Sequence, residues 1–215
     1  MRIGIIGGTG REGRGIAVRW AKAGHTVAIG SRDAARAKEK AAEFSAADGV
    51  TVGGGSNEWA VAQGDVVLLT VPYPAHGDTL RALAPALEGK ILIDITVPIK
   101  PPKVTQVSVP EGLSAALEAQ AIVGPKTRIV ATLHHVSSVH LGDPSHAIEC
   151  DVLTCSDDPE ALATVLSLVT DLGLRGLDAG PLRNSIALEA LTPVLLHLNR
   201  RYKSAGTGVK FTGIA

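Results

Sequence analysis

The chain has 215 residues, which is long enough for one large domain with a substantial core but short for two. Lysine and arginine together number 21, as do aspartate and glutamate, so the formal net charge is zero. The chain thus has no excess of positive charge that would favour binding to nucleic acid or to an anionic membrane. We expect a small molecule as the partner. Twenty-four glycines and only 3% aromatic residues favour a helix-and-sheet protein packed with aliphatic side chains.

The start of the chain and the cysteines bear on the cellular compartment. Residues 3–6 resemble a short strand and lack the longer apolar region of a signal peptide, and no apolar span of about 18 residues follows. We therefore expect a cytoplasmic protein that does not interact with membranes. Cys150 and Cys155 are five positions apart and would point to opposite faces of one strand, so we expect two buried thiols and no disulfide.

The spacing of apolar residues predicts strands that alternate with helices. Strands are predicted at residues 3–6, 26–29, 66–70, 91–95 and 128–132. Helices are predicted at residues 13–23, 33–47, 57–63, 74–87 and 114–121. We interpret the run Gly53, Gly54 and Gly55 as a turn. Because helices separate successive strands, the sheet should be parallel. We expect a six-stranded, doubly wound core of the α/β class, of which these five strands have assigned positions.

The last third of the chain is predicted to complete the same domain. Strands at residues 151–154 and 175–177, joined by a helix at 159–170, should extend the sheet to about eight strands. A helix over 184–201, capped by Asn184 and kinked at Pro193, should cover the ligand edge. We expect a single Rossmann-type domain over residues 1–215, with a dinucleotide-binding core at 1–135 and a sheet extension and C-terminal cap at 136–215.

A glycine motif lies at the junction of the first strand and the first helix. Its residues, which match G-x-G-x-x-G, are Gly8, Thr9, Gly10, Arg11, Glu12 and Gly13. Gly8 permits the tight turn, Gly10 lets the backbone approach a pyrophosphate, and Gly13 allows close packing of helix on strand. Free N–H groups at the helix start would bind the anion. The motif therefore predicts a dinucleotide site, against the alternative of a glycine-rich turn without a ligand.

The residues after the second strand indicate which dinucleotide binds. An NAD site carries Asp or Glu there, about twenty residues after the glycines, to bind the ribose 2′-hydroxyl. This chain has Ser31 and Arg32, and Arg36 lies one helical turn further on. A hydroxyl and a guanidinium donate hydrogen bonds to a 2′-phosphate, which a carboxylate would repel. We therefore expect NADP, although solvated arginines at a helix start are the alternative.

The carboxyl ends of the later strands should line the crevice that holds the nicotinamide and its partner. The segments at these ends are Thr70, Val71 and Pro72; Thr96, Val97 and Pro98; and Leu133, His134, His135, Val136, Ser137 and Ser138. His76, in the helix after Pro72, is within reach of the same opening. The loop over residues 96–112 contains four prolines and little periodicity, and we expect it to face the ligand.

The sequence shows few residues suited to acid–base or metal chemistry. His134 and His135 are adjacent, so in an extended segment they face opposite ways, and no metal-ligand spacing accompanies them. We expect no metal, and His134 shapes a ligand site or simply packs. No Ser-His-acid or Cys-His set and no lysine facing the nicotinamide is evident, so we assign no catalytic side chain. Hydride transfer between two redox cofactors needs alignment and a dry pocket more than a proton donor.

Several motifs together resemble the NADP-dependent reductases of the deazaflavin coenzyme F420. They are Gly7-Gly8-Thr9-Gly10, Gly30-Ser31-Arg32, Asp178-Ala179-Gly180-Pro181-Leu182 with Asn184-Ser185, and Leu191-Thr192-Pro193. The resemblance extends to Gly208-Val209-Lys210-Phe211 near the C-terminus. It implies reversible hydride transfer between carbon 4 of the nicotinamide and carbon 5 of the deazaflavin, with NADP and coenzyme F420 as the two redox partners.

The same resemblance implies roles for individual residues. Thr9, Ser31, Arg32 and Arg36 would hold the NADP phosphates, and His134 with the backbone of Val136 would border the deazaflavin. The archaeal members follow this histidine with Thr-Ile-Pro-Ala, whereas this chain has His135, Val136, Ser137 and Ser138. Two alternatives therefore remain: an NADPH-dependent reductase of a flavin or other acceptor, and a non-catalytic NADP sensor. The final helix is also suited to form a homodimer.

Overall fold

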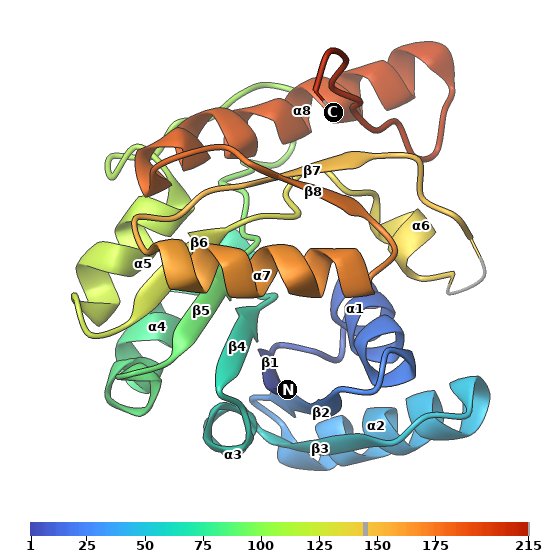
Figure 1. The fold of residues 1–215 in the computed structure, drawn as a ribbon, viewed down its shortest axis with the longest axis vertical. Helices are drawn as coiled ribbons and strands as arrows, with labels where there is room; N and C mark the ends of the chain where they lie inside the picture. Colours follow the sequence, from blue (N-terminus) through green and yellow to red (C-terminus); the bar gives the residue numbers. More distant parts are fainter. Residues whose placement is uncertain (144–145, 215) are drawn as a thin grey trace.

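The computed structural model describes residues 1–143 and 146–214 (Figure 1). Six parallel strands form the main sheet in the order β3-β2-β1-β4-β5-β6. Their bounds are β1 (Arg2–Ile6), β2 (Thr26–Ser31), β3 (Val52–Ser56), β4 (Val66–Leu69), β5 (Ile91–Asp94) and β6 (Arg128–Ala131). The chain begins at the centre of the sheet and winds outward first to one side and then to the other. This is the order of a Rossmann fold, so the predicted fold class is confirmed.

Helices cover both faces of the main sheet. These are α1 (Arg11–Lys22), α2 (Ala34–Asp48), α3 (Asn57–Gln63), α4 (Tyr73–Leu87), α5 (Ala115–Val123) and α7 (Pro159–Asp171). Two further helices, α6 (Ser138–Leu141) and α8 (Ser185–Tyr202), lie at the carboxyl ends of the strands. Alternate residues of a strand serve opposite faces. Ile5 therefore packs with α1, α2 and α7, whereas its neighbour Ile6 packs with α3, α4 and α5. The buried indole of Trp20 on α1 donates a 2.9 Å hydrogen bond to Leu168 O on α7, which joins two helices of one layer.

The three consecutive glycines form a strand, so the predicted turn is wrong. Gly53, Gly54 and Gly55 lie in β3, which pairs in parallel with β2. A Cβ built on Gly54 would lie 2.4 Å from the carbonyl oxygen of Ala37 on α2, and one on Gly55 would lie 2.5 Å from the Trp59 ring. The glycines therefore permit α2 and Trp59 to approach the edge strand closely. Glycines are typical of turns, but in β3 they allow the helix and the Trp59 ring to pack against the strand.

The two strands beyond β6 do not extend the main sheet continuously. β7 (Asp151–Thr154) and β8 (Arg175–Asp178) pair with each other in parallel as a separate two-stranded sheet. One antiparallel bridge, Ala131 to Cys155, joins it to β6. Ser156 Oγ donates to the carbonyl oxygen of Ile129 on β6 over 2.6 Å. This side chain therefore occupies a backbone acceptor of β6 that a further backbone hydrogen bond between the two segments would use. All eight strands are present, but they form two sheets.

The C-terminal helix α8 lies across the end of the molecule where the strands of the main sheet terminate (Figure 1). A 3-10 turn over Leu182–Asn184 precedes it, and the Asn184 side chain does not cap α8 but donates to the carbonyl of Ala179. The helix continues through Pro193 to Tyr202. Its buried Glu189 accepts hydrogen bonds from the first two N–H groups of α5, those of Ala115 at 2.7 Å and Ala116 at 3.1 Å. These contacts fix α8 over the ligand edge, as predicted.

Candidate active site

The glycine turn lies between β1 and α1, and each of its glycines meets a different surrounding. Gly8 N donates to the carbonyl of Gly30 over 3.0 Å, which ties the turn to the end of β2. A Cβ on Gly8 would lie 2.8 Å from Ile29, and one on Gly13 would lie 2.7 Å from Gly8. Nothing lies within 4 Å of a Cβ built on Gly10. Packing requires the first and last glycines, whereas Gly10 leaves open space above the N-terminus of α1 that suits a pyrophosphate.

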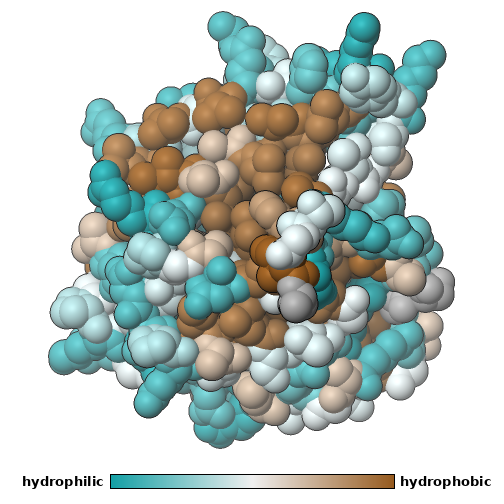
Figure 2. All heavy atoms as spheres, turned by 45° about the horizontal axis from the view of Figure 1, so that its top comes forward, coloured by the Kyte–Doolittle hydropathy of each residue, from teal (hydrophilic) through white to brown (hydrophobic). Residues whose placement is uncertain are grey.

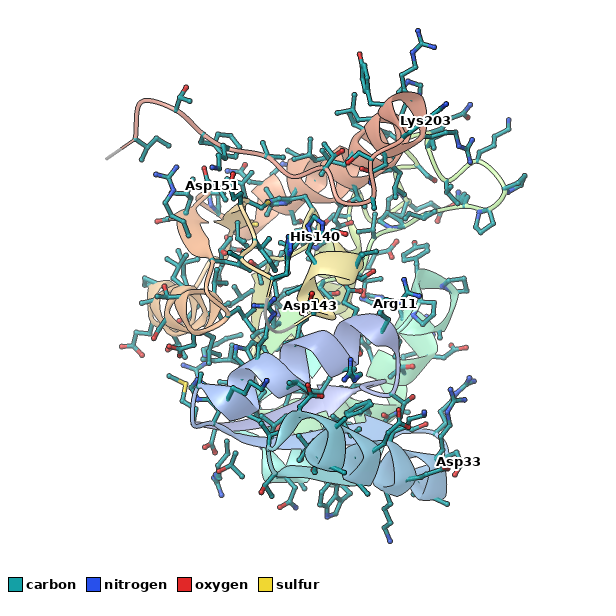
Figure 3. The ribbon with its side chains drawn as sticks, turned by 90° about the vertical axis from the view of Figure 1, so that its right-hand side faces the viewer. Arg11, Asp33, His140, Asp143, Asp151 and Lys203 are labelled. Atoms are coloured by element: carbon teal, nitrogen blue, oxygen red, sulfur yellow. The ribbon has the colours of Figure 1, made fainter. Side chains whose placement is uncertain are left out.

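The residues expected at the 2′-phosphate lie beside this turn. β2 ends at Ser31, and Arg32 and Arg36 are exposed at the start of α2. The carboxylate of Asp33 accepts a 3.1 Å hydrogen bond from Arg36 N and so caps α2. Figure 3 shows Asp33 and Arg11 on the same side of the molecule, at the first turns of their helices. The guanidinium groups of Arg32 and Arg36 and the hydroxyl of Ser31 therefore lie at or just beyond the end of β2, the strand next to the glycine turn.

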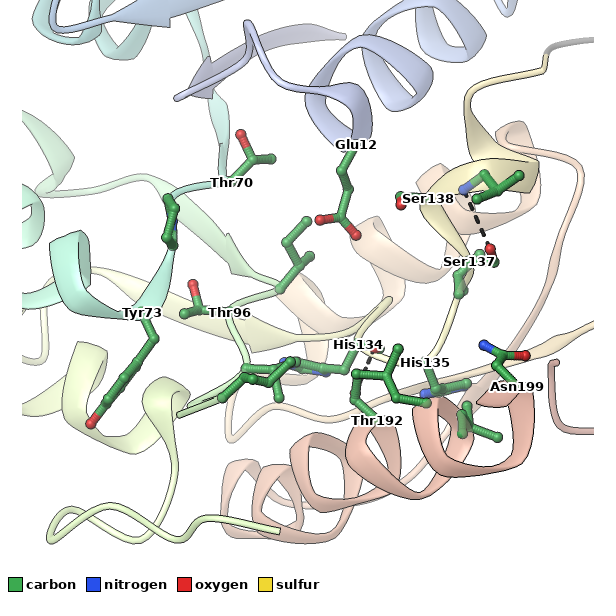
Figure 4. A pocket seen from close by; sticks show the side chains of 18 of the residues that line it. Glu12, Thr70, Tyr73, Thr96, His134, His135, Ser137, Ser138, Thr192 and Asn199 are labelled. Carbon is green, nitrogen blue, oxygen red and sulfur yellow. Dashed lines mark hydrogen bonds between the residues drawn. The ribbon is translucent and has the colours of Figure 1, made fainter. Parts of the chain in front are cut away.

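A pocket of about 440 Å³ opens on the other side of the glycine turn. Its walls come from the first turn of α1, the carboxyl ends of β4, β5 and β6, and helix α8 (Figure 4). The predicted site residues that line it are Glu12, Thr70, Val71, Pro72, Val97, His134, His135, Val136, Ser137 and Ser138. The structure thus brings together segments from four different parts of the chain. The pocket occupies the crevice at the carboxyl ends of the strands where open α/β sheets bind ligands.

Of the residues predicted at the crevice, His76, Pro98 and Leu133 do not line this pocket. His76 is buried behind its wall, where Nε2 lies 2.7 Å from Oδ2 of the fully buried Asp94 at the end of β5. Asp94 Oδ1 also accepts from Thr96 N over 2.9 Å, which fixes the start of the loop that leaves β5. Burial acts to raise the pKa of Asp94, but the hydrogen bond and charge of His76 outweigh it and lower that pKa. His76 is turned inward because a buried carboxylate holds it.

His134 is directed into the pocket by an unusual backbone turn. Leu133, buried directly after β6, has a φ of 62°, in the left-handed region that costs a non-glycine residue roughly 1–2 kcal/mol. His134 and His135 therefore lie in a turn, whereas the sequence predicts an extended segment. Neither ring nitrogen of the buried His134 has a hydrogen-bond partner, whereas His135 Nε2 lies 2.9 Å from Asp151 O. Burial lowers the pKa of His134 to about 4, so its imidazole is neutral.

The short helix α6 completes the wall beside His134. Ser137 Oγ accepts from Val139 N over 3.3 Å and caps the helix, and Ser137 Oγ also donates to Ala205 O over 3.3 Å. The half-buried Arg19 of α1 donates to the backbone carbonyls of His140, Leu141, Asp143, His146 and Leu172. A single guanidinium thereby binds the segment around α6 to the Rossmann core. The sequence does not predict this helix because it has only four residues.

Thr96, after the end of β5, lines the pocket as expected. The pocket also includes residues to which the sequence did not point. They are Tyr73, Ile95, Ile99, Val139, Thr192, Leu195, Leu196, Asn199, Ala205 and Thr207. Several belong to α8 and to the chain after it, far in sequence from the Rossmann motifs. Thr192 Oγ1 donates to His134 O over 2.7 Å, so α8 contacts the site directly. The helix predicted over 184–201 was expected to cover this edge, but its sequence did not indicate which of its side chains line the pocket.

Glu12 gives the pocket its only carboxylate among the described residues that line it, and no lysine or arginine lines it. Figure 4 shows the Glu12 side chain entering from α1, with His134 and Thr192 on the facing wall. Burial raises the pKa of Glu12 to about 7. The phenol of Tyr73 is neutral, since burial and its 2.9 Å hydrogen bond to Glu118 raise its pKa to about 12. The site can align two flat ring systems in a pocket that bears little fixed charge.

Three further features bear on the class of protein. Among the described residues, no group of three or more histidine, cysteine, aspartate or glutamate side chains is placed to hold a metal ion. No helix in the described ranges 1–143 and 146–214 has the length and apolar character needed to cross a membrane. Cys150 and Cys155 are both buried free thiols, as expected.

Comparison with known proteins identifies the family. The family model described as NADP oxidoreductase, coenzyme F420-dependent, matches residues 2–98. Over 222 residues the chain is 36% identical to the F420-dependent NADP reductase of Methanothermobacter thermautotrophicus, covering 100% of this chain and 96% of that protein. It is 36% identical over 223 residues to the enzyme of the same name from Methanocaldococcus jannaschii, covering 100% of this chain and 99% of that protein. A solved structure, a putative F420-dependent NADP-reductase from Arthrobacter sp. FB24, matches with a TM-score of 0.85 and 25% identity over 99% of both chains. The chain therefore belongs to the F420-dependent NADP reductase family.

Proposed function

We propose that the protein catalyses reversible hydride transfer between NADP(H) and the deazaflavin coenzyme F420. The observation that carries this proposal is the pocket between the glycine turn and α8, in which the neutral, buried His134 has no partner for either ring nitrogen. A buried polar group without a partner costs roughly 1–3 kcal/mol, so the imidazole is placed to bind a ligand that enters the pocket. The full-length relatives carry both redox partners in their names.

Each part of the site has a defined task in this reaction. The N–H groups of residues 10–13 bind the pyrophosphate, and Ser31, Arg32 and Arg36 bind the 2′-phosphate. Thr70, Val71, Pro72 and Val97 form the floor on which the nicotinamide lies, and residues 134–138 border the deazaflavin. α8 and the start of the 96–112 loop exclude water. The two coenzymes supply the redox chemistry, and the protein supplies alignment.

The alternative functions make different demands on the same structure. An exposed apolar surface on the C-terminal helix without a ligand crevice would favour a non-catalytic NADP sensor, but α8 forms one wall of a pocket. A reductase of free flavin remains the second candidate, since Ser137 and Ser138 replace the Pro and Ala of the archaeal members and make this wall more polar.

The experiment that tests the proposal follows the visible absorbance of oxidised coenzyme F420 mixed with NADPH and the purified protein. We expect bleaching of the deazaflavin band, and its recovery when NADP⁺ is added in excess to the reduced coenzyme. A parallel reaction with FMN should turn over at least about tenfold more slowly. Turnover of FMN without bleaching of the deazaflavin would reject the proposal in favour of the flavin reductase.

We also propose that the protein acts in the cytoplasm as a homodimer, with residues 1–215 as one NADP-binding domain. Two unpaired cysteines are typical of a reducing compartment. Figure 2 shows apolar side chains gathered on the end of the molecule where α8 lies. On this helix Val194 is 44% exposed, and Leu191 and Leu198 are half-buried. An apolar face of this kind suits the two-fold contact of a dimer.

A further inference from the structure

We infer that Glu12 is a specificity-determining residue that makes the site sense the redox state of the bound nicotinamide, holding NADP⁺ more tightly than NADPH when its carboxyl is ionised. The inference rests on the proposed function only in that NADP(H) binds at the glycine turn. The G-x-G-x-x-G motif does not imply this role for Glu12. Any residue that fits the first helical turn is compatible with the motif at that position.

The geometry places this carboxyl beside the nicotinamide half of the site. Glu12 lies in the first turn of α1, two residues after Gly10, and its side chain lines the pocket at the ends of β4, β5 and β6. Figure 4 shows its carboxyl group directed into the pocket between Thr70 and Ser138. Arg32 and Arg36 lie on the opposite side of the turn, beyond β2. A dinucleotide with its 2′-phosphate at β2 and its pyrophosphate at α1 therefore extends its nicotinamide past Glu12.

The charged groups nearest to Glu12 in sequence and space do not neutralise it. On its own helix, Arg11 is exposed, and Arg14 is engaged by Asp48 at 2.8 Å. The β6–α6 segment contributes His134 and His135, and burial lowers the pKa of both. His140, on α6, also has a lowered pKa because of burial and the nearby His146.

The remaining walls add no free charge among the described residues. The α4 wall contributes Tyr73, whose phenol donates to Glu118 and is neutral. At the end of β5, Asp94 is fully buried against His76. The residues of α8 and the C-terminal segment that line the pocket are uncharged: Thr192, Leu195, Leu196, Asn199, Ala205 and Thr207. Glu12 is thus the group in the described lining whose charge changes near neutral pH, and burial that raises its pKa to about 7 supports this.

A change of charge at this position acts differently on the two forms of the nicotinamide. The ring of NADP⁺ carries a positive charge, whereas the ring of NADPH is neutral. An ionised Glu12 attracts the first and not the second. At an effective dielectric of about 20, a unit charge pair about 6 Å apart corresponds to roughly a hundredfold in binding constant. Glu12 forms and breaks no bond in this role. It favours hydride release from NADPH as the pH rises, because the product cation is stabilised.

The test compares two dissociation constants and needs no deazaflavin. Calorimetric titration gives the Kd of NADP⁺ and of NADPH at pH 5.5 and pH 8.5 for the wild type, for Glu12→Gln, and for Glu39→Gln, an exposed control on α2. Repulsion between Glu12 and the phosphates, and ionisation of the 2′-phosphate, act equally on both ligands and cancel in the ratio of the two constants. We expect the wild-type ratio Kd(NADPH)/Kd(NADP⁺) to rise at least about tenfold between the two pH values.

The variants decide the outcome. In Glu12→Gln the ratio should change less than about twofold with pH and should equal the wild-type ratio at pH 5.5, whereas Glu39→Gln should follow the wild type. A wild-type ratio that is independent of pH, or one that keeps its pH dependence in Glu12→Gln, overturns the inference. Either result would leave deazaflavin bleaching intact, so it is distinguishable from failure of the proposed function.

Discussion

His134 and His135 are neighbours in the chain, but their surroundings give them opposite effects on stability. His134 has two unpartnered ring nitrogens, whereas His135 contacts the carbonyl of Asp151 at 2.9 Å. Replacing a buried, unsatisfied polar side chain by an apolar one of similar size removes a desolvation cost. His134→Leu should therefore raise the free energy of unfolding by about 1 kcal/mol, or the Tm by about 2–4 °C for a chain of this size.

The matched variant His135→Leu should lower the Tm, because Asp151 O loses its imidazole partner. The same His134→Leu protein should bind NADPH normally and coenzyme F420 at least about tenfold more weakly. Thermal unfolding followed by circular dichroism, with titrations of both coenzymes, checks these expectations. Equal loss of stability in the two variants would mean that His134 is a packing residue.

Arg32 carries the expected preference for NADP over NAD. It is exposed at the end of β2 next to Ser31, and a charge-assisted hydrogen bond contributes roughly 1.5–3 kcal/mol. Arg32→Glu should weaken NADPH binding by about a hundredfold or more and leave NADH binding within about threefold. Fluorescence titration with both nucleotides measures this, with Lys22→Glu at the far end of α1 as the control for charge. Similar losses for NADPH and NADH would place the 2′-phosphate elsewhere.

At the scale of elements, the docking of α8 on α5 predicts a dependence of stability on pH. Burial raises the pKa of Glu189 to about 8, although the N–H groups of Ala115 and Ala116 act to lower it. The folded protein therefore retains a proton that the unfolded chain releases near pH 4.5. The stability that this proton contributes is fully present below that pH and is lost as the pH rises through about 8, with a slope of up to about 1.4 kcal/mol per pH unit.

Urea unfolding at pH 5, 6, 7 and 8 measures this slope. In Glu189→Gln the fall in unfolding free energy across this range should be smaller than in the wild type. Glu12→Gln should flatten only the part of the curve below about pH 7, since the pKa of Glu12 is raised to about 7. An unchanged slope in Glu189→Gln would show that this carboxyl is ionised in the folded protein at neutral pH.

At the scale of the whole molecule, the face of α8 that bears Val194 is the proposed dimer contact. A charge in an apolar interface is costly, so Val194→Asp should shift the protein from dimer to monomer at micromolar concentration. Ala47→Asp, at an exposed position of α2, should leave the mass unchanged. Light scattering coupled to size-exclusion chromatography checks both. A monomeric wild type, or a dimeric Val194→Asp protein, would exclude this interface.

Much of the Rossmann half could be predicted because its signals are local. The strands β1, β2, β4, β5 and β6 are short apolar runs, and the glycine motif and Ser31 lie next to them in sequence. Local patterns gave wrong predictions where small or polar residues contact segments that are distant in the sequence. The glycines of β3 accommodate Trp59 and α2. β7 pairs with β8 and meets β6 only at the bridge between Ala131 and Cys155.

The candidate site divides in the same way. The sequence by itself determined the glycine turn, the positions of Arg32 and Arg36 after β2 and the segments that end β4, β5 and β6, because each follows its strand directly. Only the tertiary structure decided that His76 turns inward to Asp94, that α8 closes the pocket, and that Glu12 titrates near neutral pH. Desolvation and contacts between distant segments exist only after the chain has packed, so no local pattern carries them.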